Sequence, residues 1–257
     1  MGGVGARHGA ACCAVAGVVY ALGGFDGQTV LGAAERFDPA RRGWERLPEL
    51  PTRRGRCAAA ACEGLVFVAG GSDDSSEVAA FEEFQPSKWQ WQARPALPTP
   101  RAGLGLASTG RSLLALGGKV QGEKLSTVER FDLAQMTWEL LKPLSSPRDG
   151  CSACGLLGRV YVFGGRGALE ALCRQAMSFL RYGHDGKPDS RAGGRLANGD
   201  GVLELIIDHH WPFEECFDPD TGSWTALPML LGSCFVRSRW ARMPHATCGC
   251  AAAAAEH

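Results

Sequence analysis

Short blocks of hydrophobic and polar residues alternate along the chain and predict β-strands. Runs of aliphatic, β-branched and aromatic residues bounded by glycine lie at 18–22, 65–69, 112–116 and 160–164, a pattern typical of strands buried on both faces. A small apolar segment precedes each run. After it come an alternating segment that ends near Asp-Pro and then a segment that contains Trp. We therefore expect an all-β chain built of repeated four-stranded units.

A period of 47 residues connects these units. Twin glycines begin at Gly23, Gly70, Gly117 and Gly164. Arginine, glutamate, phenylalanine and tryptophan keep the same step, at Arg7, Arg54, Arg101 and Arg148; Glu35, Glu82 and Glu129; Phe37, Phe84 and Phe131; and Trp44, Trp91 and Trp138. Several residue types in phase at one period are typical of a repeat architecture.

The fourth repeat is longer than the others. Phe217 and Trp224 lie 39 residues beyond the positions that the period gives, so we expect an insertion at about 166–213. Residues 169–180 have helical spacing inside it. The insertion is either a partner-binding loop or translated non-coding sequence. The repeats span about 7–53, 54–100, 101–147 and 148–228, and a partial fifth at about 245–257 follows, where residues 248–257 repeat the pattern of 55–64.

Each marker of the repeat has a physical reason. The twin glycine ends the buried strand where backbones crowd and no Cβ fits. Asp-Pro favours a tight turn between the third and fourth strands. Trp fills the space between neighbouring sheets. A unit of this size cannot bury both of its faces alone, so we expect the sheets to stack radially.

The twin glycine, the "ERFDP" motif and the Trp that follows resemble the kelch repeat family. The resemblance implies a kelch-type β-propeller with four recognisable four-stranded blades and the start of a fifth. The blades form either a closed or nearly closed ring, or an open arc of a larger, incomplete propeller. An open arc would leave blade faces and strand edges exposed.

The recurring Glu and Arg residues are predicted to be structural, because catalytic carboxylates do not occur once per repeat. We expect the glutamates to pair with arginine or backbone amides between blades. The resemblance also implies that the loops after the twin glycine and around the arginine line the mouth of a central channel, where partners bind. These loops differ from blade to blade and hold His8, Phe25, Asp26, Gln28, Arg53, Arg56, Ser72, Asp73, Asp74, Lys119, Gln121, Asp149 and Arg166.

Charge balance, apolar runs and cysteine content make several classes of protein less favoured. Lys and Arg equal Asp and Glu at 27 each, which does not favour nucleic-acid binding. No apolar run is long enough for a membrane span, and the N-terminus lacks a signal-peptide pattern. We expect a cytoplasmic protein. The 11 cysteines are expected to be buried thiols rather than disulfides. Cys248 and Cys250, near His245 and His257, fit a core strand better than a metal site.

No catalytic, phosphate-binding or zinc motif stands out, so no cofactor, no metal and no enzymatic activity are expected. The predicted function is a protein-interaction module that binds a peptide segment of a partner at the loop rim. By resemblance it serves as a scaffold or as a substrate adaptor of a ubiquitin ligase. Two alternatives stay open: a kelch-type enzyme acting on a sugar or small metabolite, and a truncated, non-functional fragment.

Overall fold

The computed structural model describes residues 5–167 and 215–226, which form strands, turns and loops. They build four antiparallel four-stranded sheets, here called blades 1 to 4. Blades 1 and 2 consist of β1 (Ala11–Val15), β2 (Val18–Leu22), β3 (Ala34–Asp38) and β4 (Gly43–Arg46), then β5 (Ala58–Cys62), β6 (Leu65–Ala69), β7 (Phe81–Gln85) and β8 (Gln90–Arg94). Blades 3 and 4 consist of β9 (Gly105–Thr109), β10 (Ser112–Leu116), β13 (Val128–Asp132) and β14 (Thr137–Leu141), then β15 (Ser152–Leu156), β16 (Arg159–Phe163), β17 (Glu215–Asp218) and β18 (Ser223–Ala226).

The buried second strands agree closely with the sequence pattern. β2, β6 and β10 have the bounds that the hydrophobic runs predict, and β16 begins one residue earlier than expected. Most residues of β6 and β10 are buried, since each of these strands lies in the middle of its sheet and has blades on both sides. A two-stranded hairpin, β11 (Lys119–Val120) and β12 (Glu123–Lys124), extends the loop after β10.

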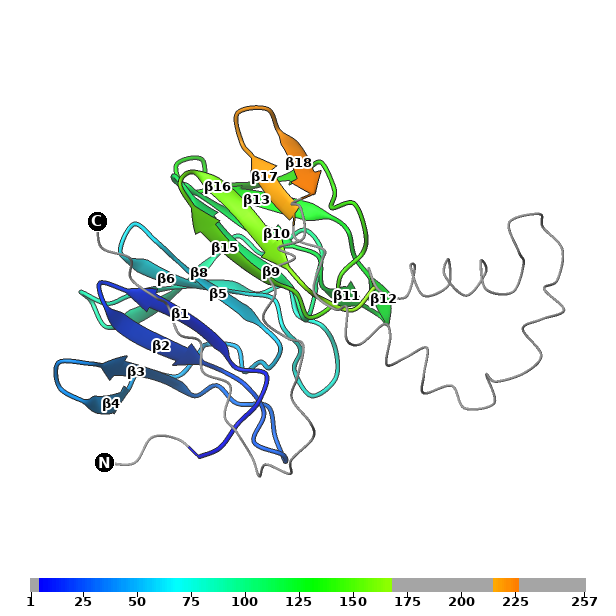
Figure 1. The fold of residues 1–257 in the computed structure, drawn as a ribbon. Helices are drawn as coiled ribbons and strands as arrows, with labels where there is room; N and C mark the ends of the chain where they lie inside the picture. Colours follow the sequence, from blue (N-terminus) through cyan, green and yellow to red (C-terminus); the bar gives the residue numbers. More distant parts are fainter. Residues whose placement is uncertain (1–4, 168–214, 227–257) are drawn as a thin grey trace, which may run out of the picture.

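The four blades stack in chain order, as the colours of Figure 1 show. Their first strands lie side by side, β1 against β5, β5 against β9 and β9 against β15. Within the described ranges no comparable packing joins β15 to β1, and blades 1 and 4 lie at the two ends of the stack (Figure 1). The four-blade propeller arrangement is therefore an arc in the described part of the chain.

Hydrophobic cores fill the three junctions between blades. Between blades 2 and 3, for example, Phe67 and Phe81 of one sheet pack against Phe131 and Leu113 of the next. The phenylalanine rings of Phe81 and Phe131 meet edge to face with centroids 4.9 Å apart. This geometry stabilises aromatic pairs beyond their burial alone.

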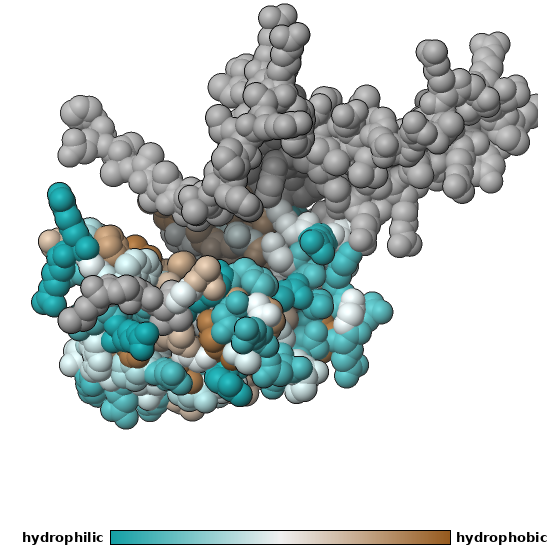
Figure 2. Space-filling view, turned by 90° about the horizontal axis from the view of Figure 1, so that it is seen from below, coloured by the Kyte–Doolittle hydropathy of each residue, from teal (hydrophilic) through white to brown (hydrophobic). Residues whose placement is uncertain are grey.

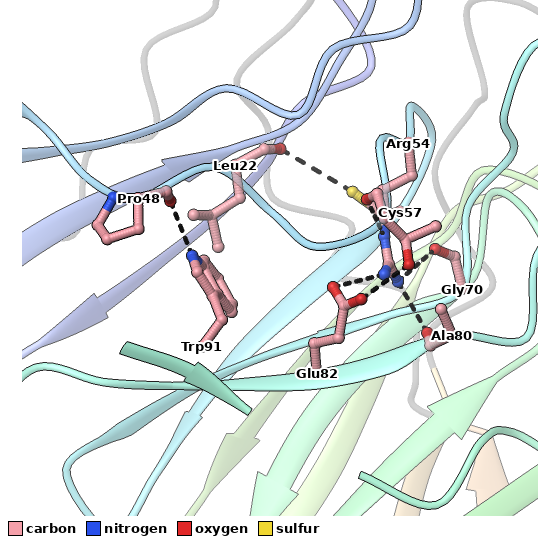
Figure 3. Close-up of polar contacts among 9 residues, drawn as sticks. Leu22, Pro48, Arg54, Cys57, Gly70, Ala80, Glu82 and Trp91 are labelled. Atoms are coloured by element: carbon pink, nitrogen blue, oxygen red, sulfur yellow. Dashed lines mark hydrogen bonds and ion pairs between the residues drawn. The ribbon is translucent and has the colours of Figure 1, made fainter. Parts of the chain in front are cut away.

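At each of the three junctions a tryptophan lies between neighbouring sheets, as predicted, and hydrogen-bonds to the preceding blade. The indole N–H of Trp91 donates to the Pro48 carbonyl of blade 1 at 2.8 Å (Figure 3). Trp138 does the same to the carbonyl of Pro95 at 2.8 Å, and Trp224 to the carbonyl of Lys142 at 3.0 Å. Trp44 departs from the prediction: it is 42% exposed, since no described blade precedes blade 1.

The cysteines only partly follow the expected pattern. Cys57, Cys62, Cys151 and Cys216 are buried, but Cys12 and Cys154 are exposed. Burial raises the pKa of the Cys57 thiol to about 11, which keeps it protonated at neutral pH. The exposed pair lies on the outward faces of blades 1 and 4, where no described neighbour covers them.

Two sequence predictions lie outside the described residues. They are the insertion, apart from its first two residues, with the helix predicted at 169–180, and the partial fifth repeat at about 245–257. In the described part of the chain no helix has the length and apolarity that a membrane span requires. Seen from below Figure 1, the described surface is mostly hydrophilic, with small groups of hydrophobic residues among the polar ones (Figure 2).

Candidate functional site

Each blade contains a buried ion pair between an arginine ahead of its first strand and a glutamate in its third. In blade 2 the guanidinium of Arg54 lies 2.6 Å from the Glu82 carboxylate, and both residues are buried. Arg54 also donates to the carbonyls of Gly70 and Ala80 (Figure 3). Its Nε donates to the carbonyl of Thr52. These contacts offset the cost of burying the charge, because a buried ion is tolerated only when it is paired and hydrogen-bonded.

The same pair recurs in the other blades, as Arg7–Glu35 at 2.7 Å, Arg101–Glu129 at 2.5 Å and Arg148–Glu215 at 2.6 Å. Burial lowers the pKa of the Arg101 guanidinium, while the charge of its partner Glu129 opposes that shift. Fourfold repetition and burial, complete for Arg54, Arg101 and Arg148 and nearly so for Arg7, support a structural role for these residues. The ion pairs themselves lie within one repeat rather than between blades. Pairing with a backbone amide of the preceding repeat, also expected, does occur in blade 4, where the Glu215 carboxylate accepts from the N–H of Ser145 at 3.0 Å.

The twin glycines bring each second strand against the next blade. Gly70 has a φ of +58°, and a Cβ there would lie 2.4 Å from the carbonyl oxygen of Arg101. The next N–H, of Gly71, donates to that same carbonyl at 2.8 Å. Glycine is therefore required here both by the backbone conformation and by the close approach, as predicted from the sequence.

The two groups of loops that sequence analysis selected lie side by side. In every blade a residue of the loop before the first strand forms an antiparallel backbone bridge with a residue of the loop after the twin glycine. The four pairs are His8–Phe25, Gly55–Ser72, Ala102–Lys119 and Asp149–Arg166. We call these pairs and the loops that carry them the rim. The backbone arrangement is the same in each blade, whereas the side chains differ completely.

Blade 1 presents an aromatic pair at the rim. The rings of His8 and Phe25 meet edge to face with centroids 5.3 Å apart. His8 is exposed and Phe25 is half-buried. The two nearly perpendicular rings offer apolar faces together with the polar edge of the His8 imidazole, which is suited to contact with a partner side chain.

Two of the predicted rim aspartates shape their own loops. Asp26 accepts hydrogen bonds from the N–H groups two and three residues on, each at 2.8 Å, and Asp73 does the same in blade 2. These hydrogen bonds lower the pKa of Asp26 and of Asp73, because they favour the ionised carboxylate. Such Asx turns fix the loop conformation, so these carboxylates act mainly on the backbone.

Other rim side chains connect neighbouring blades. The Asp74 carboxylate accepts a hydrogen bond from the N–H of Val30 in blade 1 at 3.3 Å. One blade further, Glu77 accepts from the N–H of Gln121 at 3.2 Å. Glu77 was not selected from the sequence. Both contacts tie a rim loop to the loop beside it.

Arg56 departs from the repeat. The equivalent residues one period apart are Gly9, Gly103 and Gly150, and all four have positive φ, +52° at Arg56. A non-glycine residue in this region is uncommon and costs free energy. Backbone strain retained at one blade out of four is a frequent mark of a functional position.

The Arg56 side chain forms an ion pair with Asp149, two blades away. The Nη2 and Oδ1 atoms lie 2.6 Å apart, and the Arg56 side chain is 41% exposed. The pair passes over Gly103 of the intervening blade, where a Cβ would lie 2.3 Å from the Asp149 carboxylate and 3.0 Å from the guanidinium. Sequence analysis had selected Arg56 and Asp149 separately. It missed Gly103, although the glycine step through this position was a signal that could have found it.

The backbone beneath this ion pair forms a continuous line of hydrogen bonds. The N–H of Arg56 donates to the carbonyl of Gly9, that of Gly103 to Arg56, and that of Gly150 to Gly103, at 2.7 to 2.8 Å. One bond therefore joins each blade to the next at the inner end of the rim. The rim side chains therefore project from a regularly hydrogen-bonded backbone.

Three cationic side chains of the rim are at least partly accessible to a binding partner. Arg53 and Arg166 are exposed and Lys119 is half-buried. Arg166 follows the twin glycine of blade 4, and its backbone is bridged to Asp149, which places it near the Arg56 ion pair. Gln28 is exposed at the tip of its loop, apart from these groups.

A groove of about 520 Å³ lies elsewhere, along the outer strands of blade 1. It is lined by Glu35, Arg36, Asp38, Arg41, Gly43, Trp44, Glu45 and Arg46. No residue predicted from the sequence to bind a partner lines it. Among the described residues no group of three or more His, Cys, Asp or Glu side chains is placed to hold a metal ion.

Comparison with known proteins agrees with this architecture. A family model described as the Kelch motif matches residues 6–51, 53–98 and 100–145, more than half of the chain. The solved structure of YjhT is similar, with a TM-score of 0.57 at 19% identity, over 66% of this chain and 64% of that one. The chain thus matches less than two thirds of that neighbour's length. In a search of curated proteins no sequence match was found.

Proposed function

The chain belongs to the family of kelch-motif proteins, and we propose that it is a protein-interaction module that holds a segment of a partner protein at its rim. One observation carries the proposal. Four identical backbone bridges present four different side-chain pairs, from His8–Phe25 in blade 1 to Asp149–Arg166 in blade 4. A fixed scaffold with variable loops is the usual arrangement of a binding surface on a repeat protein.

The charges of the rim suggest what it binds. Asp26 and Asp73 are engaged by backbone N–H groups of their own loops, and Asp149 is paired with Arg56. Arg53 and Arg166 remain exposed. We therefore expect a peptide segment held by polar and cationic side chains and by the aromatic pair of blade 1, in a binding rather than a catalytic role.

A narrower form of the proposal is that the partner is a substrate that the protein presents to a ubiquitin ligase in the cytoplasm, or one component of a scaffold. Family membership alone supports this form. Recovery of a cullin component together with the partner would support it, and recovery of the partner alone would leave the general interaction role.

Affinity capture with quantitative mass spectrometry tests the general proposal. The Arg53→Glu/Arg166→Glu variant changes two exposed rim charges. The control, Arg111→Glu, changes a 68%-exposed arginine in the turn between β9 and β10, away from the rim loops. Partners should be lost by the rim variant and kept by the control. Partners that bind the rim variant as well as the unmodified chain would overturn the proposal.

A further inference from the structure

Blade 1, at one end of the stack (Figure 1), exposes side chains that are covered at every junction between blades. Val19 and Phe37 are half-buried, and Trp44 is 42% exposed. The residues equivalent to Val19 and Phe37 in blades 2 to 4 are at most 3% exposed, because a preceding blade packs on them; they are Val66, Leu113, Val160, Phe84, Phe131 and Phe217. The outer face of blade 1 is thus one half of a blade junction.

Blade 4, at the other end, exposes the opposite half of a junction. In blades 1 to 3 the second-strand residues Tyr20, Phe67 and Leu114 are at most 2% exposed, because the following blade packs on them. Their equivalent in blade 4, Tyr161, is only half-buried. Cys154, its partner in the register of β15 and β16, is exposed. The two ends of the arc are therefore complementary in kind.

The side chains at the two ends match those of an existing junction. Between blades 1 and 2, a tyrosine packs in one cluster with a valine, a phenylalanine and a tryptophan of the next blade; they are Tyr20, Val66, Phe84 and Trp91. The rings of Tyr20 and Phe84 have centroids 6.2 Å apart. The same four residue types hold the equivalent positions at the ends, as Tyr161 on blade 4 and Val19, Phe37 and Trp44 on blade 1. Packing of one end on the other would repeat the junction of blades 1 and 2.

The backbone groups of the two ends are complementary as well. At each junction the second of the twin glycines donates its N–H to the carbonyl of an arginine in the next blade, at 2.7 to 2.9 Å. The equivalent donor on blade 4 is Gly165, and the equivalent acceptor on blade 1 is Arg7. Neither group has a backbone partner among the described residues. The line of hydrogen bonds beneath the rim likewise stops at the N–H of Gly9 and the carbonyl of Gly150.

We propose that copies of this chain associate head to tail, with the open face of blade 4 of one copy packed on the open face of blade 1 of the next. A second copy is the occupant because this chain itself carries the side chains and backbone groups that each end lacks. Such a heterologous joint closes into a ring or continues as a filament. Two copies of four blades each bring eight, a number with which propellers close.

The joint would also extend the rim from one copy to the next. The last backbone bridge of blade 4, Asp149–Arg166, would be followed by the first bridge of the second copy, His8–Phe25. A partner could then contact the cationic part of one rim and the aromatic pair of the other.

Light scattering after size-exclusion chromatography, between about 1 and 300 μM protein, measures the association. Joining separate chains costs translational and rotational freedom, so we expect monomers at the low end of this range and larger species at the high end. Trp44→Arg blocks the blade 1 end, and Cys154→Arg blocks the blade 4 end. Both positions are exposed, so neither variant should unfold, which thermal unfolding checks. Leu156→Arg, 58% exposed in β15, is a second variant for the blade 4 end.

Each blocked variant alone should stay monomeric over the whole range. An equal mixture of Trp44→Arg and Cys154→Arg should form dimers and nothing larger, because one open end of each kind remains. Recovery of association on mixing also shows that both variants are folded. Self-association of either blocked variant alone would overturn the proposal, since it would mean that two like ends meet.

Leu140→Arg is the matched control. Leu140 is 69% exposed on β14, the outer strand of blade 3, and lies at neither end of the arc. This variant should associate like the unmodified chain, and loss of association here would overturn the proposal in favour of non-specific apolar contact. An unmodified chain that stays monomeric at every concentration would overturn it too, and is the result expected if another part of the same chain covers the two ends.

Discussion

Two arginines of blade 2, two residues apart in the sequence, have opposite environments. Arg54 and Arg56 each lie 2.6 Å from a carboxylate. Arg54 is fully buried and its pair with Glu82 recurs in every blade, whereas Arg56 is exposed, replaces a glycine and pairs with Asp149 two blades away. Equal distance therefore does not mean equal role. The repeated pair holds the architecture, and the single exception lies where the blades differ.

The largest effect is expected when the repeated pair is broken. Arg54→Met leaves the Glu82 carboxylate buried without its partner, which should lower the free energy of unfolding by about 3–5 kcal/mol. The double variant Arg54→Met/Glu82→Leu removes both charges and should recover much of the loss. Urea unfolding of both variants measures this. A single variant as stable as the unmodified protein would show that the pair does not hold the blade.

A smaller loss is expected from Gly103, beneath the second pair. Gly103→Ala adds a Cβ that overlaps the Asp149 carboxylate at a φ of +65°, so we expect about 1–3 kcal/mol of destabilisation. Gly150→Ala is the control, because its φ is +77° but no atom lies within 4 Å of the added Cβ. In thermal unfolding, Gly103→Ala should have a lower midpoint temperature than Gly150→Ala. A higher midpoint for Gly103→Ala would mean that the overlap with the Asp149 carboxylate is relieved without a cost in free energy.

The tryptophans allow a blade that has a described blade before it to be compared with blade 1, which has none. Trp138→Phe removes a hydrogen bond to the preceding blade and should cost about 1 kcal/mol. Trp44→Phe should cost almost nothing, because Trp44 donates to no carbonyl among the described residues and is 42% exposed. Equal losses in urea unfolding would indicate that blade 1 has a neighbour after all.

The smallest change in stability is expected at Arg56 itself. Arg56→Gly removes the partner of Asp149, whose side chain is only 11% exposed, but it also relieves the positive φ. The two effects oppose each other, so the net loss should stay below about 1 kcal/mol. Capture of a partner at the rim should nevertheless weaken. Thermal unfolding and affinity capture on the same sample separate the two effects, and a large drop in stability would place Arg56 with Arg54 as part of the framework.

The repeat made most of the fold predictable. A weak signal such as a twin glycine becomes strong when it recurs in phase, so the bounds of β2, β6 and β10 and the structural role of the recurring Arg and Glu residues followed from the sequence. The rim loops could be selected for the same reason, as the places where the repeats differ.

The contacts within the rim could not be predicted. Arg56 and Asp149 are far apart in the chain, and their pairing depends on the curvature of the stack and on the missing Cβ of Gly103. The exposure of Trp44 likewise depends on which sheet lies beside it. These properties belong to the arrangement of the blades, which no single repeat encodes.

The line of backbone hydrogen bonds from Gly9 to Gly150 has a consequence for how such a protein can change over time. Because each blade adds one bond and contacts mainly its neighbours, tandem duplication or loss of a 47-residue unit of coding sequence would leave the remaining joints intact. The Arg56–Asp149 pair is different, since it requires one intervening blade with a glycine at its tip. Gain or loss of a repeat between Arg56 and Asp149 would break this ion pair, whereas gain or loss of a repeat outside that interval would leave it intact.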